Sequence, residues 1–76
     1  MKFKFKPDDF TYSDEHDAWF CGDMNFGIGL FKDGDMWNAN IVCGGDVTLV
    51  DGCFTRSHAM AESLKTYERL FDETQS

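Results

Sequence analysis

The sequence predicts one α+β domain, an antiparallel β-meander of four to five strands with one C-terminal helix packed on one face as a two-layer sandwich. Apolar residues alternate with small or polar ones on both sides of Asp33-Gly34, which is typical of a β-hairpin. After Thr55 the apolar residues recur with the period of a helix. The 76 residues contain no repeat or linker, so residues 1–76 are expected to form a single domain.

The N-terminal segment from Lys2 to Lys6 alternates lysine with phenylalanine. This pattern predicts a strand with Phe3 and Phe5 inward and the lysines outward. An edge position is favoured because lysines discourage the addition of further strands.

A first hairpin is predicted to close at Gly22-Asp23. In that register Trp19 lies opposite Phe26, and Cys21 lies opposite Met24.

The central hairpin is predicted with Asp33-Gly34 as a type I′ loop. This register gathers eight apolar residues on one face: Leu30 with Trp37, Ile28 with Ala39, Phe26 with Ile41, and Met24 with Cys43. The opposite face then holds Phe31 with Met36, Gly29 with Asn38, Gly27 with Asn40, and Asn25 with Val42. A slip of one residue would mix the two sets, so the register should be well specified.

A three-residue loop at Gly44-Gly45-Asp46 leads into the last predicted strand. It places Val47 opposite Cys43 and Leu49 opposite Ile41. Asp51-Gly52 interrupts the pattern and predicts a bulge.

The predicted helix follows Thr55. Met60, Leu64, Tyr67 and Phe71 have the spacing of one helix stripe, which would cover the apolar face of the sheet. Either Ser57 or Thr55 can serve as the N-cap.

The charge is unevenly distributed along the chain. The formal net charge is -7, and residues 7–55 carry ten carboxylates against a single base, Lys32. A field of this sign repels nucleic acid and anionic membrane and attracts basic protein surfaces. No direct nucleic-acid or membrane partner is therefore expected.

The predicted meander places five of these acids at one end of the sheet: Asp14, Glu15, Asp17, Asp33 and Asp35. Asp23 and Asp46 fall at the other end. The functional interpretation is an acidic rim that binds a cationic groove, as nucleic-acid mimics do. The alternative is that aspartate is a good loop residue that supplies solubility.

The face of the sheet away from the helix is predicted to be flat and polar, with glycines and asparagines at its centre: Asn25, Gly27, Gly29, Asn38 and Asn40. The aromatic and aliphatic residues Phe20, Phe31, Met36, Val42 and Val50 lie on or near it. Glycine weakens a strand, so either a partner or a second subunit approaches closely here, or aromatic rings fold over the glycines.

Metal binding and catalysis are not expected. The histidines and cysteines lack the spacing of a zinc site: His16, Cys21, Cys43, Cys53 and His58. Asp33-Gly34-Asp35 resembles a fragment of a calcium loop without its other ligands. Ser57 has no nucleophile-elbow motif around it, and acids on an open rim do not form an acid–base pocket. No cofactor is predicted.

The three cysteines are an odd number, which favours free thiols in a reducing compartment over a disulfide-stapled secreted domain. The alternating N-terminus does not have the continuous apolar stretch of a signal peptide. A cytoplasmic location in a host cell is expected.

The segment from Gly52 to Glu62 loosely resembles the end of the sheet in HicB-type antitoxins, where a strand leads through Gly and Thr into an Ala-rich helix. The family pattern expects a further strand after that helix, and the sequence to Ser76 does not supply it. As a small, acidic and aromatic-rich chain, the protein is also similar in class to phage-encoded anti-defence proteins, including anti-CRISPRs and DNA mimics.

The sequence therefore predicts a non-enzymatic inhibitor from a phage or mobile element that binds a cationic, nucleic-acid-binding surface of a host complex. The partner-binding residues would be the five acids Asp14, Glu15, Asp17, Asp33 and Asp35, together with Phe31, Met36, Asn38 and Asn40. The alternative is a small homodimeric structural or antitoxin-like module that associates through the Gly/Asn face.

Overall fold

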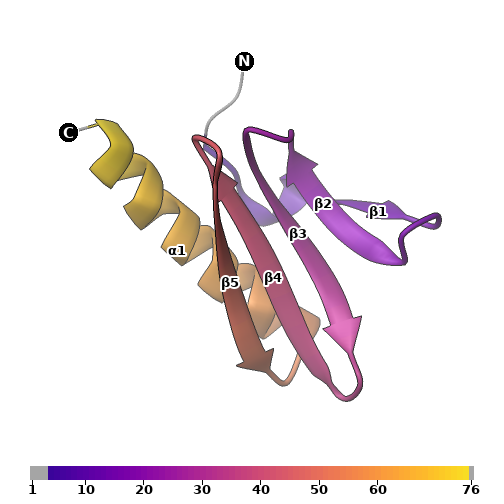
Figure 1. Ribbon diagram of the computed structural model, residues 1–76. Helices are drawn as coiled ribbons and strands as arrows, with labels where there is room; N and C mark the ends of the chain where they lie inside the picture. The colour runs from indigo at the N-terminus through magenta and orange to yellow at the C-terminus, as the bar shows by residue number, and fades with distance from the viewer. Residues whose placement is uncertain (1–3, 76) are drawn as a thin grey trace.

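The computed structural model describes residues 4–75 and confirms the predicted α+β sandwich (Figure 1). A 3₁₀ turn, η1 (Pro7–Asp9), precedes five strands in the order β1-β2-β3-β4-β5. The strands are β1 (Thr11–Ser13), β2 (Ala18–Gly22), β3 (Phe26–Asp33), β4 (Met36–Cys43) and β5 (Asp46–Cys53), followed by helix α1 (Arg56–Gln75). All neighbouring strands are antiparallel, so the sheet is a simple meander.

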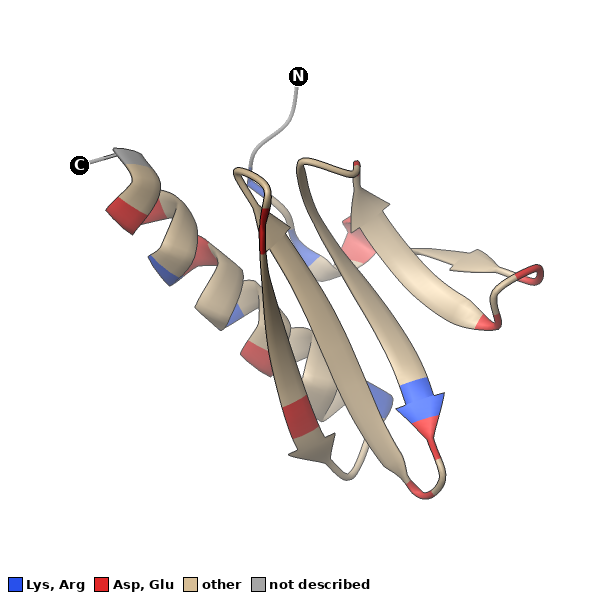
Figure 2. Ribbon diagram, viewed as in Figure 1, with Lys and Arg blue, Asp and Glu red and all other residues tan. Residues whose placement is uncertain are grey.

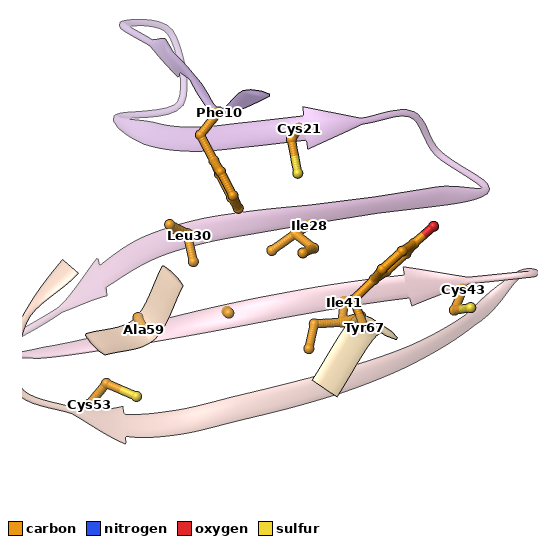
Figure 3. Close-up of a cluster of buried hydrophobic side chains, with 10 residues drawn as sticks. Phe10, Cys21, Ile28, Leu30, Ile41, Cys43, Cys53, Ala59 and Tyr67 are labelled. Carbon is orange, nitrogen blue, oxygen red and sulfur yellow. The ribbon is translucent and has the colours of Figure 1, made fainter. Parts of the chain in front are cut away.

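The helix covers one face of the sheet and leaves the other face bare among the described residues (Figure 1). The segment before β1 also lies on the helix side, where it contributes Phe10 to the core. The buried cluster joins Leu30, Ile41 and Tyr67 with residues from β2, β5 and the helix (Figure 3). We call the uncovered side the open face.

The central hairpin is present as predicted, but the residues that pair across it differ from the prediction. Gly34 and Asp35 make the turn, and Ile28 pairs with Ile41. Gly34 has φ +64° and Asp35 does not have a positive φ, which fits a type II′ turn in place of the predicted type I′. The shift moves each strand partner by two residues. Because side chains alternate with a period of two, the division between the two faces is unchanged.

The β2–β3 connection is also longer than predicted. Cys21 pairs with Ile28, and the Asp23 carboxylate accepts hydrogen bonds from the backbone N–H groups of Asn25 and Phe26 at 2.8 and 2.9 Å. This capped turn includes Met24, which was predicted to face the core and is instead 91% exposed.

The face predicted for β5 was wrong. Gly44 and Gly45, at φ +63° and +92°, close a two-residue loop where three residues were expected. Val47 therefore pairs with Val42, and Leu49 pairs with Asn40. This one-residue change turns both side chains onto the open face, and Val50 packs on the core in their place.

The bulge predicted at Asp51-Gly52 is confirmed. Val50 pairs with Ala39 and Cys53 with Trp37, so two residues of β5 lie opposite Asn38 alone. Gly52 has φ +75°, which glycine adopts without the steric cost that other residues bear. The bulge brings Cys53 back into the core.

The N-terminal strand is not formed in the described residues. Lys4 to Lys6 have no strand structure, and the prediction for Lys2 and Phe3 lies outside the described residues. Phe5 nevertheless packs inward, with its ring centre 5.1 Å from that of Tyr67. The strand at the β2 edge of the sheet is β1, which was not predicted.

The helix begins after Thr55, whose hydroxyl oxygen accepts a hydrogen bond from the His58 backbone N–H at 3.0 Å. Of the two candidate N-cap residues, Ser57 and Thr55, the structure shows that Thr55 is the N-cap. The most buried helix stripe contains Ala59, Ser63 and Tyr67. The predicted Met60, Leu64 and Phe71 flank that stripe and are half-buried.

Candidate functional site

The first acidic group lies in the β1–β2 connection, where Asp14, Glu15 and Asp17 are all exposed. Asp17 has φ +49°, a left-handed conformation that Asp tolerates better than most residues. Its carboxylate accepts a hydrogen bond from the Tyr12 hydroxyl at 2.5 Å. That hydrogen bond raises the pKa of Tyr12, with further contributions from burial and from the nearby carboxylates.

The second acidic group lies in the β3–β4 hairpin, where Asp33 and Asp35 are exposed. Both groups are at the same end of the strands, but Figure 2 shows them apart, because β3 and β4 continue beyond the last β2 pair. Lys32 immediately precedes Asp33 and brings a cation to this end. The five acids therefore form two patches.

A second cation lies near this end of the sheet on the helix side. The Arg56 guanidinium is 4.3 Å from the centre of the Trp19 ring, a cation–π contact between the start of α1 and β2. Trp19 also packs against Tyr12, with 5.4 Å between ring centres. Arg56 is therefore held on the helix side of the sheet.

The predicted apolar and amide residues share the open face. Phe31 pairs with Asn38, Asp33 with Met36, and Gly29 with Asn40. Asn40 is exposed, whereas Phe31, Met36 and Asn38 are half-buried. Because the register change was even, these residues occupy the predicted face although their predicted partners were wrong.

The two central glycines have explanations within the chain. A side chain at Gly29 would meet the Phe20 ring, which lies 2.9 Å from the position of an added Cβ. A side chain at Gly27 would lie 2.6 Å from the carbonyl oxygens of Cys21 and Asp23. The aromatic ring folded over a glycine, one of the two explanations expected from sequence, is thus present at Gly29.

The open face is more apolar than predicted. Phe20 is 42% exposed, Val47 66% and Leu49 56%, and all three lie on this side of the sheet. Ala18 is buried here, outside the core cluster. The sequence signal for Val47 and Leu49 was the glycine pair at 44–45, because two residues tolerant of positive φ fit a two-residue hairpin loop.

A shallow groove of about 750 Å³ runs along the open face over β2, β3 and β4. It is lined by residues of the β1–β2 loop, the β2–β3 turn and the three strands, among them His16, Phe20, Met24, Phe31 and Val42. Asn25, predicted to lie on this face, is in the turn, and Val50 is on the opposite side.

Among residues 4–75, the ionisable groups whose pKa values are clearly shifted do not form a reactive pair. Burial is the main cause of the raised pKa of the Cys53 thiol, and nearby Glu62 and Asp51 add to it. A buried, protonated thiol is a poor nucleophile. Both histidines are exposed: His16 packs edge-on against Phe20, and His58 lies 3.9 Å from Glu62.

Within residues 4–75, no three His, Cys, Asp or Glu side chains gather closely enough to hold a metal ion. The three cysteines are buried free thiols on the helix side of the sheet. The helix found in the described part of the chain does not combine the length and apolar character that crossing a membrane requires.

Comparisons with protein-family models, with curated proteins and with solved structures found no match to this chain.

Proposed function

We propose that this protein is a non-enzymatic interaction protein that binds a cationic protein surface through its open face and the two acidic loops beside it. The observation that carries the proposal is the absence of bases from the strand positions of that face in residues 4–75, together with five exposed carboxylates at its end. Ordinary protein surfaces intersperse both signs of charge.

The two kinds of residue have different roles in this proposal. The carboxylates of Asp14, Glu15, Asp17, Asp33 and Asp35 attract and orient the basic partner, which chiefly raises the association rate. Phe31 and Met36 supply apolar contacts that slow dissociation, and the amides of Asn38 and Asn40 supply hydrogen bonds.

A surface that binds nucleic acid is cationic, so it is the natural partner of such a face. We propose that the protein occupies the nucleic-acid-binding surface of a host complex, as an anti-defence inhibitor encoded by a phage or mobile element and acting in the host cytoplasm. The small size, the acidic charge and the lack of a reactive pair among the described residues support this.

The test compares charge reversal at the hairpin with the same reversal elsewhere. We expect Asp33→Lys with Asp35→Lys to weaken capture of a host protein from lysate and to reduce the salt dependence of binding. The control combines Asp8→Lys with Glu68→Lys, two exposed acids of η1 and α1 whose reversal changes net charge equally. Capture is repeated with nuclease and with added duplex DNA or RNA, which should compete.

Equal binding by both double variants would contradict the proposed surface. A captured protein that is not displaced by nucleic acid would contradict the mimicry, even if the acidic residues prove necessary.

A second candidate function is a homodimeric structural or antitoxin-like module that associates through the open face. The exposed Val47 and Leu49 favour it, since contiguous exposed apolar residues mark interaction surfaces. Sedimentation at several protein concentrations separates the two candidates. A salt-independent dimer that Phe31→Glu disrupts would support the module and displace the inhibitor.

A further inference from the structure

The groove on the open face is lined by backbone and by apolar side chains. Gly27 and Gly29 of β3 line it, with the Phe20 ring over Gly29 and the carbonyl oxygens of Cys21 and Asp23 next to Gly27. The apolar side chains of the lining include Phe20, Phe31 and Val42. Its volume of about 750 Å³ is within the range of clefts that bind small molecules, roughly 300–1,000 Å³.

The two ends of the groove carry the same sign of charge. The β1–β2 loop, which contributes His16 to the lining, also holds Asp14, Glu15 and Asp17. At the other end the lining includes Asp23. Two backbone N–H groups hydrogen-bond to the Asp23 carboxylate and hold its pKa below the usual value, so it is ionised near neutral pH.

None of the lining residues in the described part of the chain is a lysine or arginine. A second copy of the chain, with its formal charge of -7, would bring acidic loops against acidic loops. A segment with positive charges on both sides of a large apolar side chain would match the groove in shape and in charge.

We propose that this groove binds a bulky apolar side chain, flanked by lysines or arginines, from the cationic partner. The proposal rests on the proposed function and adds the place where the partner is anchored. The apolar side chain packs on Phe20, Phe31 and Val42, and the flanking cations lie near the loop acids at one end and Asp23 at the other.

The probe is a short synthetic peptide with one tryptophan between pairs of lysines, added to isotope-labelled protein at low ionic strength. Two matched peptides serve as controls, one with alanine for tryptophan and one with glutamates for lysines. We expect the tryptophan peptide to shift the backbone amide resonances of Gly27, Gly29 and Asn40. The alanine peptide should leave these resonances unchanged, and the glutamate peptide should not bind.

A pair of variants tests the wall directly. Val42→Thr keeps the shape of the side chain and suits a strand, but it puts a hydroxyl into the groove. Val50→Thr makes the same change on the helix side of the sheet, at a residue that does not line the groove. We expect Val42→Thr to weaken binding of the tryptophan peptide about three- to tenfold and Val50→Thr to leave it unchanged.

The outcomes separate this inference from the proposed function. If the tryptophan and alanine peptides caused equal resonance shifts, confined to the acidic loops, the groove would not be the binding site of the apolar side chain. The proposal that the acidic surface binds a cationic partner would still stand. Binding of the glutamate peptide would contradict the inference that the groove prefers a side chain flanked by positive charges. A dimer in sedimentation whose open face is buried, with no peptide binding, would show that a second copy occupies the groove and would overturn the inference.

Discussion

The hydroxyl group of Tyr67 is a buried polar atom for which no hydrogen-bond partner occurs in the described part of the chain. The residue is 1% exposed, and its ring packs against those of Phe5 and Phe71, at 5.1 and 6.0 Å between centres. A buried hydroxyl that has lost its water without gaining a partner opposes folding. We therefore predict that Tyr67→Phe, which keeps the ring and removes the hydroxyl, stabilises the protein.

The expected gain follows from the desolvation of one unsatisfied group, about 1–3 kcal/mol at neutral pH. In a domain of this size each kcal/mol corresponds to roughly 4–8 °C in Tm. Tyr67→Ala tests the ring itself: it should cost about 3–5 kcal/mol, because the stacked aromatic contacts are lost and a cavity remains.

Alkaline pH should widen the difference between Tyr67→Phe and the unmodified protein. Burial is the main cause of the rise in the pKa of Tyr67 from 10.0 to about 12. Because the pKa of Tyr67 is higher in the folded than in the unfolded state, ionisation of the phenol favours unfolding. The stability of the unmodified protein is therefore unaffected by this group below pH 10 and falls as pH rises through 12. Two pKa units correspond to roughly 2–3 kcal/mol of stability that the unmodified protein loses and the phenylalanine variant keeps.

The assay is thermal and urea unfolding at pH 7 and across the alkaline range, with Tyr12→Phe as the matched control. Tyr12 is exposed and donates its hydroxyl hydrogen bond to Asp17, so its removal should bring no gain at pH 7. The chain has only these two tyrosines, so ultraviolet titration of each variant isolates the other phenol. A Tyr67→Phe variant less stable than the unmodified protein at pH 7 would refute the reasoning, as would a phenol of Tyr67 that ionises at the ordinary pKa.

Three further predictions concern residues whose local interactions or backbone conformation stabilise the turns and the start of the helix. Thr55→Ala should lower stability in urea unfolding by about 1 kcal/mol, because the N-cap bond to the His58 N–H is lost, while Ser57→Ala should have little effect. Asp23→Ala should lower the Tm at pH 7 but less at acid pH. The depressed pKa of Asp23 means that its contribution exists above the unfolded pKa and disappears as pH falls through the folded one. Gly45→Ala should cost about 1–2 kcal/mol in the same unfolding assay, since φ at this position is +92°.

The fold class could be predicted from sequence because it depends on which side chains share a face. The two hairpins around β3 were predicted with the wrong strand partners, by shifts of two and four residues along the partner strand. Even shifts preserve the alternation, so Ile28, Leu30 and Ile41 were still assigned to the core. Errors of this kind leave the architecture intact.

The last strand shows the opposite case. The predicted loop was longer than the observed one by a single residue, and this odd error exchanged Val47 and Leu49 with Val50. The alternation of apolar residues could not show which side of β5 faces the core, because odd-numbered and even-numbered positions of this strand both hold apolar or β-branched residues. The local signal that distinguishes the two loops is the glycine pair at 44–45, because both glycines adopt the positive φ of a two-residue hairpin loop.

The corrected register also changes what the candidate site is made of. With Val47 and Leu49 inward, the open face would have offered a partner fewer apolar contacts, chiefly those of Phe31 and Met36 beside the glycines, asparagines and acidic end. With both outward, the same face offers apolar contacts next to carboxylates. Charge attraction between exposed groups weakens with salt, whereas apolar burial does not. A partner bound by this face should therefore associate more slowly at high salt yet dissociate at a nearly unchanged rate. Measuring both rates against ionic strength distinguishes this mixed surface from a purely electrostatic one, for which dissociation would also accelerate.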